Sequence, residues 1–189
     1  MTGARARLTL PRVTLADVLV SAAVLALVVG ATLVTLEQGQ QAFAVGAARV
    51  EAQQSARVAL TWLTAELRQA GEGITAPSGP AISVAEPTRV VLHADKNHNN
   101  MIAGAGETIV WRLDHDILRR DAGGGAQPVI NGVRALTFLY FDAAGAPTTI
   151  PSAVRRIHIT LTTGPSHTTS IFTKNLTTTF TTEAHLRNR

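Results

Sequence analysis

The stretch RVTLADVLVSAAVLALVVGATLVTL, residues 12–36, combines a basic start, one acidic side chain and a long apolar run. After Asp17 the next ionisable side chain is Glu37, so residues 18–36 are 19 consecutive uncharged residues. A helix of about 20 apolar residues crosses the roughly 30 Å of hydrocarbon in a bilayer. A helix also satisfies all of its own backbone hydrogen bonds in lipid. The stretch therefore predicts a transmembrane helix over residues 13–36.

The charges before this helix predict its orientation. Arg5, Arg7 and Arg12 precede the apolar run, and basic flanking segments stay in the cytoplasm. We expect residues 1–12 to be a basic cytoplasmic leader and the chain after the helix to be extracytoplasmic. Two alternatives remain open. One is a secretory signal peptide cleaved near residues 42–44, although its apolar region would normally span about 7–15 residues. The other is the core helix of a soluble domain.

The composition narrows the chemistry. Lys and Arg exceed Asp and Glu by 17 to 13, which gives a formal charge of +4, and cysteine is absent. The chain therefore has no disulfide framework, no thiolate nucleophile and no cysteine metal site. Because the basic excess gathers at the two ends of the chain, it favours membrane topology over a nucleic-acid surface.

Residues 37–71 predict an extension of the helix. Leu60, Leu63 and Leu67 recur at helical spacing, and Gly71 and Gly73 then end the pattern. We expect this apolar stripe to pack on the protein's own sheet. Packing on helices of neighbouring subunits is the alternative.

Residues 72–189 predict a β-rich domain of short strands separated by turns. In residues 154–162, Ile157, Ile159 and Leu161 alternate with polar residues, as in a half-buried strand. The threonine-rich residues 177–182 suit a solvent-facing edge strand or a docking strand. The fold class that follows is α+β, with a long N-terminal helix packed by its C-terminal half on an antiparallel sheet. The strands are predicted at residues 81–84, 89–93, 108–113, 117–120, 129–130, 135–141, 154–162 and 170–182.

Asp17 stands at the mouth of the apolar helix. A carboxylate near hydrocarbon is costly unless it stays at the interface or finds a cation. The residue three positions before it is Thr14, and this spacing predicts a capping box at the helix start. A functional interpretation requires a cationic partner for the carboxylate.

The segment Val13-Thr14-Leu15-Ala16-Asp17 resembles the N-terminal signature of type IV pilins and type II secretion pseudopilins. In that family a basic leader is cut after a glycine by prepilin peptidase. The acidic residue then pairs with the freed amine of a neighbouring subunit. The resemblance gives Asp17 this acidic role and gives Val13 the amine. Arg12 stands where the family has its glycine, so the action of the peptidase on this chain stays open.

Later segments extend the resemblance over nearly the whole chain. QQSARVALTWLTAELRQAG (residues 53–71) is similar to the helix end of PilW-like minor pilins and J-type minor pseudopilins, and PVINGVRALTFLYFDAAG (residues 128–145) is also similar to this group. The resemblance implies a pilin-like fold and a structural subunit at or near a filament tip. Its partners would be other pilin subunits, and it would wait in the bacterial inner membrane. The alternatives are a membrane-anchored binding module for DNA or Ca²⁺ that never assembles, and a secreted β-rich protein.

The segment DKNHNNMIAGAGE, residues 95–107, is the candidate ligand loop. Asp95, Asn97 and Asn99 alternate as oxygen ligands do in a calcium loop. Asn100 stands where such loops have glycine, and Glu107 comes one residue later than in an EF-hand. A Ca²⁺ site is one interpretation, and a hairpin loop rich in asparagine is the other.

No sequence pattern supports catalysis. The six histidines lack zinc-site spacing, Gly123 to Gly125 is not followed by Lys-Ser/Thr, and there is no nucleophile elbow. We therefore predict that the protein is not an enzyme. Five arginines could form a basic face for DNA, but solvated arginines on strand faces are the preferred interpretation; these are Arg119, Arg120, Arg134, Arg155 and Arg156.

Overall fold

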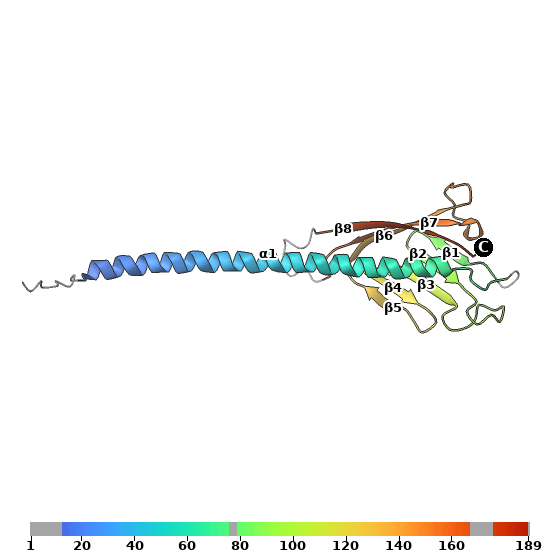
Figure 1. The fold of residues 1–189 in the computed structure, drawn as a ribbon, viewed down its shortest axis with the longest axis horizontal. Helices are drawn as coiled ribbons and strands as arrows, with labels where there is room; N and C mark the ends of the chain where they lie inside the picture. Colours follow the sequence, from blue (N-terminus) through green and yellow to red (C-terminus); the bar gives the residue numbers. More distant parts are fainter. Residues whose placement is uncertain (1–12, 76–78, 167–175, 189) are drawn as a thin grey trace, which may run out of the picture. The chain divides into compact units, whose positions relative to one another are not determined.

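The computed structural model describes residues 13–75, 79–166 and 176–188. It contains one long helix, α1 (Leu15–Gln69), followed by eight strands and a short 3-10 helix, η1 (Pro151–Ala153) (Figure 1). The chain divides into two compact units, Met1–Ala44 and Val45–Arg189. The order of elements confirms the predicted α+β class, with an apolar N-terminal helix and an antiparallel sheet domain.

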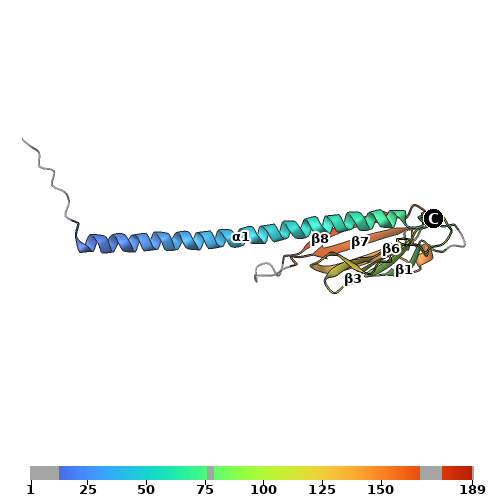
Figure 2. The ribbon, with the colours of Figure 1, turned by 90° about the horizontal axis from the view of Figure 1, so that it is seen from below.

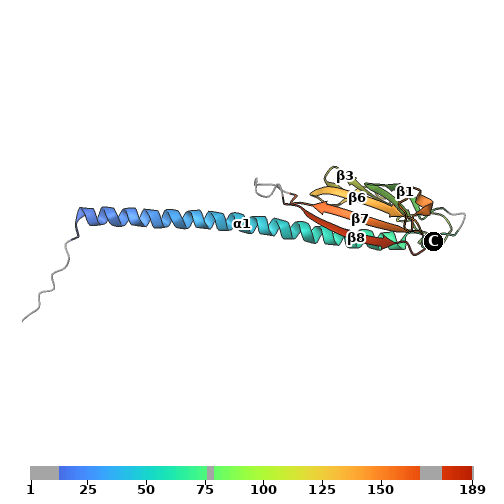
Figure 3. The same ribbon diagram turned by 90° about the horizontal axis from the view of Figure 1, so that it is seen from above.

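The second part of α1 belongs to the globular unit because one of its faces is apolar. Ala56, Ala59, Leu63 and Leu67 are fully buried. They are spaced three and four residues apart, so they line one side of the helix. Figures 2 and 3 show this part of α1 lying along one side of the sheets. The packing of residues 60–70 on the protein's own sheet is therefore confirmed.

The strands form two antiparallel sheets. The larger sheet has the order β1-β2-β3-β4-β5 and the smaller has the order β6-β7-β8. A single buried apolar core joins both sheets to α1. A strand is found at each of the eight predicted places, with shifted ends for all but residues 89–93, while residues 170–175 of the last predicted strand lie outside the described residues. The eight strands are β1 (Ile82–Glu86), β2 (Arg89–His93), β3 (Thr108–Asp114), β4 (Ile117–Asp121), β5 (Gln127–Ile130), β6 (Val133–Phe141), β7 (Arg156–Thr163) and β8 (Thr178–His185).

The sequence predicted one sheet, and the division into two has a backbone explanation. The Phe138 N–H of β6 donates to the Pro87 carbonyl at 2.7 Å, and the Val133 N–H donates to the Asp116 carbonyl at 2.9 Å. Pro87 and Asp116 belong to the β1–β2 and β3–β4 hairpin turns. Hairpin turns therefore bond to β6 where a further strand would otherwise pair. Tyr140 adds a side-chain bond from its hydroxyl to the Glu86 carbonyl at 2.7 Å.

A buried carboxylate connects α1 to the larger sheet. Glu66 is 8% exposed and accepts hydrogen bonds from the indoles of Trp62 and Trp111, at 3.1 and 2.6 Å. Arg120 Nε donates to the same carboxylate at 2.8 Å, and its guanidinium stacks over the Trp62 ring. The two indole rings meet edge to face at 5.8 Å. A charge in the core is tolerated because each carboxylate oxygen has a donor.

The last strand leaves one edge of the smaller sheet unpaired. The Leu186 N–H, just after β8, donates to the Arg155 carbonyl, so the even-numbered residues of β8 direct their backbone groups to β7. The backbone groups of Thr179, Thr181, Glu183 and His185 then point away from β7. Within the described part of the chain they have no backbone partner. Strand β8 therefore lies at the edge of its sheet, as predicted for residues 177–182.

Candidate functional site

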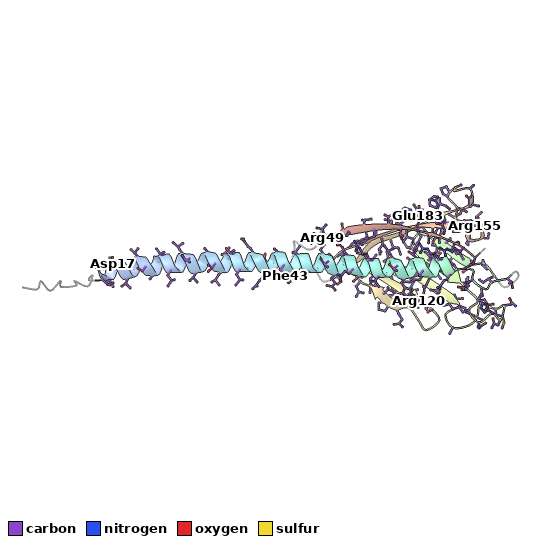
Figure 4. All side chains as sticks on the ribbon, in the orientation of Figure 1. Asp17, Phe43, Arg49, Arg120, Arg155 and Glu183 are labelled. Atoms are coloured by element: carbon purple, nitrogen blue, oxygen red, sulfur yellow. The ribbon has the colours of Figure 1, made fainter. Side chains whose placement is uncertain are left out.

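Asp17 lies at the start of α1 (Figure 4), and there it forms the predicted capping box with Thr14. Its Oδ2 accepts hydrogen bonds from the Thr14 backbone N–H at 2.9 Å and from the Thr14 hydroxyl at 2.8 Å. The Asp17 N–H donates back to Thr14 Oγ1 at 3.3 Å. The negative charge lies in the first turn, where the helix dipole favours it. This geometry fixes the carboxylate at the helix start.

One oxygen of this carboxylate is left over. No described residue donates to Asp17 Oδ1. A carboxylate oxygen without a partner is suited to accept a charge-assisted hydrogen bond from a cation. Of the other residues in the segment 13–17, Val13 and Leu15 are 72% and 78% exposed. Arg12 and the rest of the predicted leader lie outside the described residues.

The helix after Asp17 is apolar on all sides. Its large hydrophobic side chains are about half exposed or more; they include Leu19, Val24, Leu27, Leu33 and Leu36. In length and composition α1 is sufficient to cross a membrane near the N-terminus. The 19 uncharged residues would span about 28 Å as a helix. An apolar surface of this size is compatible with a single membrane span or with packing against other apolar surfaces.

The candidate calcium loop brings its two acidic residues into the domain interior. Asp95 is fully buried and Glu107 is 2% exposed. Glu107 accepts backbone hydrogen bonds from Lys96, Asn97 and Gly104. These bonds satisfy the buried Glu107 carboxylate without a metal ion.

Asp95 and the two asparagines organise the same loop. The Asp95 carboxylate accepts from the N–H groups of Asn99 and Asn100, while the Asn97 and Asn99 side chains each accept from the N–H two residues on. Asn100 has φ 61, the left-handed conformation that glycine adopts in calcium loops. In the described part of the chain, no group of three or more acidic, histidine or cysteine side chains is placed to hold a metal. The Ca²⁺ site stays a prediction.

The five arginines of the proposed basic face do not gather on one surface. Arg119 and Arg120 are consecutive in β4, so they point to opposite sides of the sheet. Arg119 pairs with Asp114 at 2.9 Å, whereas Arg120 points inward to Glu66. Arg156 lies on the smaller sheet, 3.5 Å from Glu183. The preferred interpretation of solvated arginines is therefore wrong for Arg120, because its guanidinium pairs with the buried Glu66 carboxylate.

Two polar clusters were not predicted from the sequence. In the first, Trp111 and Arg120 lie 45 and 54 residues after Glu66, so no local sequence spacing indicates the contacts. A second cluster links Ser83, His93 and Thr108 from three neighbouring strands. The strand register alone brings these side chains together, so a single sequence gives no signal for them.

Comparison with known proteins found no family model that matches this chain and no curated protein with significant similarity to it.

Proposed function

We propose that this protein is a minor pilin or pseudopilin, a structural subunit that assembles through α1 into a type IV pilus or a type II secretion pseudopilus. The observation that carries the proposal is the pairing of one capped carboxylate, Asp17, with an otherwise uncharged helix over residues 18–36. The pilin-like order of motifs along the chain supports the same function.

The proposed mechanism follows from the solvent requirements of the helix. Before assembly, the uncharged part of α1, residues 18–36, lies in the bacterial inner membrane, with residues 1–12 in the cytoplasm and the β domain outside. During assembly, helices of neighbouring subunits replace lipid around it. Apolar contacts are similar in both surroundings, so hydrophobicity alone gives little preference. Asp17 makes the filament more favourable than the membrane, because its Oδ1 pairs with a cation from a neighbouring subunit, and it does so in only one register of the helices.

The identity of that cation depends on the leader. Cleavage before Val13 would create an N-terminal amine on each subunit, which is the partner that the resemblance implies. Prepilin peptidase would have to accept Arg12 in the place of glycine. A position at or near the filament tip is compatible with Arg12 in this place, because a tip subunit is needed in few copies and slow cleavage would still supply them.

A second candidate is a membrane-anchored extracytoplasmic module that binds DNA or Ca²⁺ and does not enter a filament. Arg12 favours it, since a retained leader leaves no free amine at Val13. The Ca²⁺ version would have to displace the backbone N–H groups that now donate to the buried Asp95 and Glu107 carboxylates.

The deciding experiment is the intact mass of the protein extracted from the membranes of its native host. A chain that begins at Val13, especially a methylated one, supports the filament subunit. A chain that retains its leader contradicts the processed-pilin mechanism and favours the fixed anchor.

A variant tests the role of the charge separately from the role of the cap. Asp17→Asn removes the negative charge but keeps a side-chain oxygen that can accept the Thr14 hydrogen bonds. We expect this variant to reach the membrane normally and to be lost from the sheared filament fraction. Asp17→Glu restores the charge and serves as the control. Filament incorporation of Asp17→Asn at the wild-type level would contradict the proposed pairing.

A further inference from the structure

His93 is a buried titratable side chain that the proposed function does not use. His93 is 8% exposed, and each of its ring nitrogens contacts a hydroxyl group. Nε2 lies 2.7 Å from Ser83 Oγ, and Nδ1 lies 2.9 Å from Thr108 Oγ1. The three residues come from adjacent strands. His93 and Thr108 are directly opposite in the register of β2 and β3, and Ser83 sits at the irregularity between Ile82 and Val84 in β1.

The supply of protons sets the direction of this hydrogen-bond chain. Thr108 has one hydroxyl proton, and it donates that proton to the Ile102 carbonyl at 3.2 Å. The tautomer with the ring proton on Nδ1 is the one that satisfies this bond and both His93 contacts together, because Thr108 Oγ1 then accepts from Nδ1–H. In this tautomer Nε2 carries a lone pair. The Ser83 hydroxyl then donates its proton toward Nε2.

The surroundings keep His93 in the form that this arrangement requires. Burial lowers the pKa of His93 below its ordinary value of 6.5, because desolvation disfavours the charged ring. At neutral pH the ring is uncharged and Nε2 is free to accept a proton. Ser83 is the exposed end of the chain of bonds, and it lies on β1, an edge strand of the larger sheet. A small reagent in solvent can therefore reach its hydroxyl.

We propose that Ser83 is a nucleophilic hydroxyl, with His93 as its general base and Thr108 as the residue that orients the base. A nucleophile, a base within hydrogen-bond reach and a third group that holds the base are the parts that activate a hydroxyl for acyl transfer. The substrate class is an activated ester whose acyl group is presented at the surface of the domain. This site is independent of helix assembly and of the capping box at Asp17.

The transfer step balances without any cofactor. Ser83 Oγ forms a bond to the carbonyl carbon of the ester, and the bond from that carbon to the leaving oxygen breaks. The proton of the Ser83 hydroxyl passes to His93 Nε2 and then to the leaving oxygen. The products are an O-acyl serine and a free alcohol or phenol.

The test uses the full chain in detergent micelles and p-nitrophenyl acetate as the probe. Peptide mapping by mass spectrometry measures acetylation of Ser83 and of Ser166, an exposed serine in the same molecule that serves as an internal control. General-base assistance predicts acetylation of Ser83 about 100-fold faster than that of Ser166 at neutral pH. The rate at Ser83 should decrease as the pH falls through the lowered pKa of His93.

Variants distinguish a reactive site from a merely structural one. Ser83→Ala should remove the fast-labelled peptide, and His93→Gln should reduce the Ser83 rate to that of Ser166. Thr108→Val removes the acceptor of Nδ1–H with little change of shape and should give a smaller decrease, so it replaces His93→Gln if that variant does not fold. Equal rates at Ser83 and Ser166, an acetyl group on His93 itself, or a Ser83 rate without pH dependence would each overturn the proposal.

Discussion

Glu66 shows how one side chain can hold a helix to two strands. Its carboxylate receives two indole N–H groups and one guanidinium, and these come from α1, β3 and β4. Its partner Arg120 is also mostly buried, with its side chain 20% exposed. Replacing one member of such a cluster leaves the others without partners in a medium that solvates them poorly.

We therefore predict that Glu66→Ala lowers the free energy of unfolding by about 3 kcal/mol, because the Arg120 charge loses its partner. Glu51→Ala is the matched control, since Glu51 is exposed and has no side-chain bond among the described residues. Denaturation followed by tryptophan fluorescence reports directly on Trp62 and Trp111. A loss equal to that of the control would show that the cluster contributes little.

His93 gives the fold a defined response to acid. Its pKa is lowered by desolvation in the folded state, so the unfolded chain binds this proton more tightly. We predict that the free energy of unfolding decreases as the pH falls from the ordinary value of 6.5 to the lowered folded-state pKa. In His93→Gln the free energy of unfolding should decrease less over this pH range, because the variant lacks the His93 imidazole. Chemical denaturation at a series of pH values measures the difference, and parallel curves for the two proteins would contradict the assignment.

At the scale of elements, the end of α1 depends on Gly71. This residue follows the helix with φ 85, and its N–H donates to the His93 carbonyl at 2.8 Å. A Cβ at this position would run into the Asn188 carbonyl and lie 3.0 Å from the Ala81 side chain. Helix termination, strand β2 and the C-terminal segment therefore meet at one glycine.

We predict that Gly71→Ala lowers stability by about 2 kcal/mol, through left-handed strain and the close backbone contact together. Gly145→Ala separates the two causes. Gly145 has φ 82 but open space around its α-carbon, so that variant should lose only about 1 kcal/mol. Thermal unfolding of both variants tests the expected order. Equal losses of stability in the two variants would mean that the Asn188 carbonyl moves away from the new Cβ with no cost in free energy.

The elements were largely predictable from the sequence, and their assembly was not. Helical spacing at Leu60, Leu63 and Leu67 and alternation in β7 are local signals, so the helix and all eight strands were expected. The capping box was also expected, since Thr14 and Asp17 are three residues apart. The division into two sheets depends on bonds such as that from Phe138 to Pro87, which join segments distant in sequence. The contacts of Glu66 and His93 depend on register in the same way, which no local pattern records.

At the scale of the whole molecule, the two units have opposite requirements. Residues 18–36 expose an apolar surface on every side, whereas the second unit has its own buried core. We predict that a chain beginning at Val45 is recovered in the soluble fraction, while the full chain requires detergent. The truncated chain should keep its Tm, because the buried part of α1 is retained from Ala56 onward. Fractionation and calorimetry measure both properties, and a truncated chain found with membranes would contradict the division.

The unpaired edge of β8 carries a hazard during expression and purification. Exposed strand edges serve as templates for another chain, and proteins commonly place a charge there as a gatekeeper against aggregation. Glu183 fills this position, and its hydrogen bond from His158 lowers the pKa of its carboxyl group, with Arg156 adding to the effect. The gatekeeper therefore keeps its charge in mildly acidic buffers. The domain's solubility in acid thus depends on a neighbouring histidine as well as on the edge strand itself.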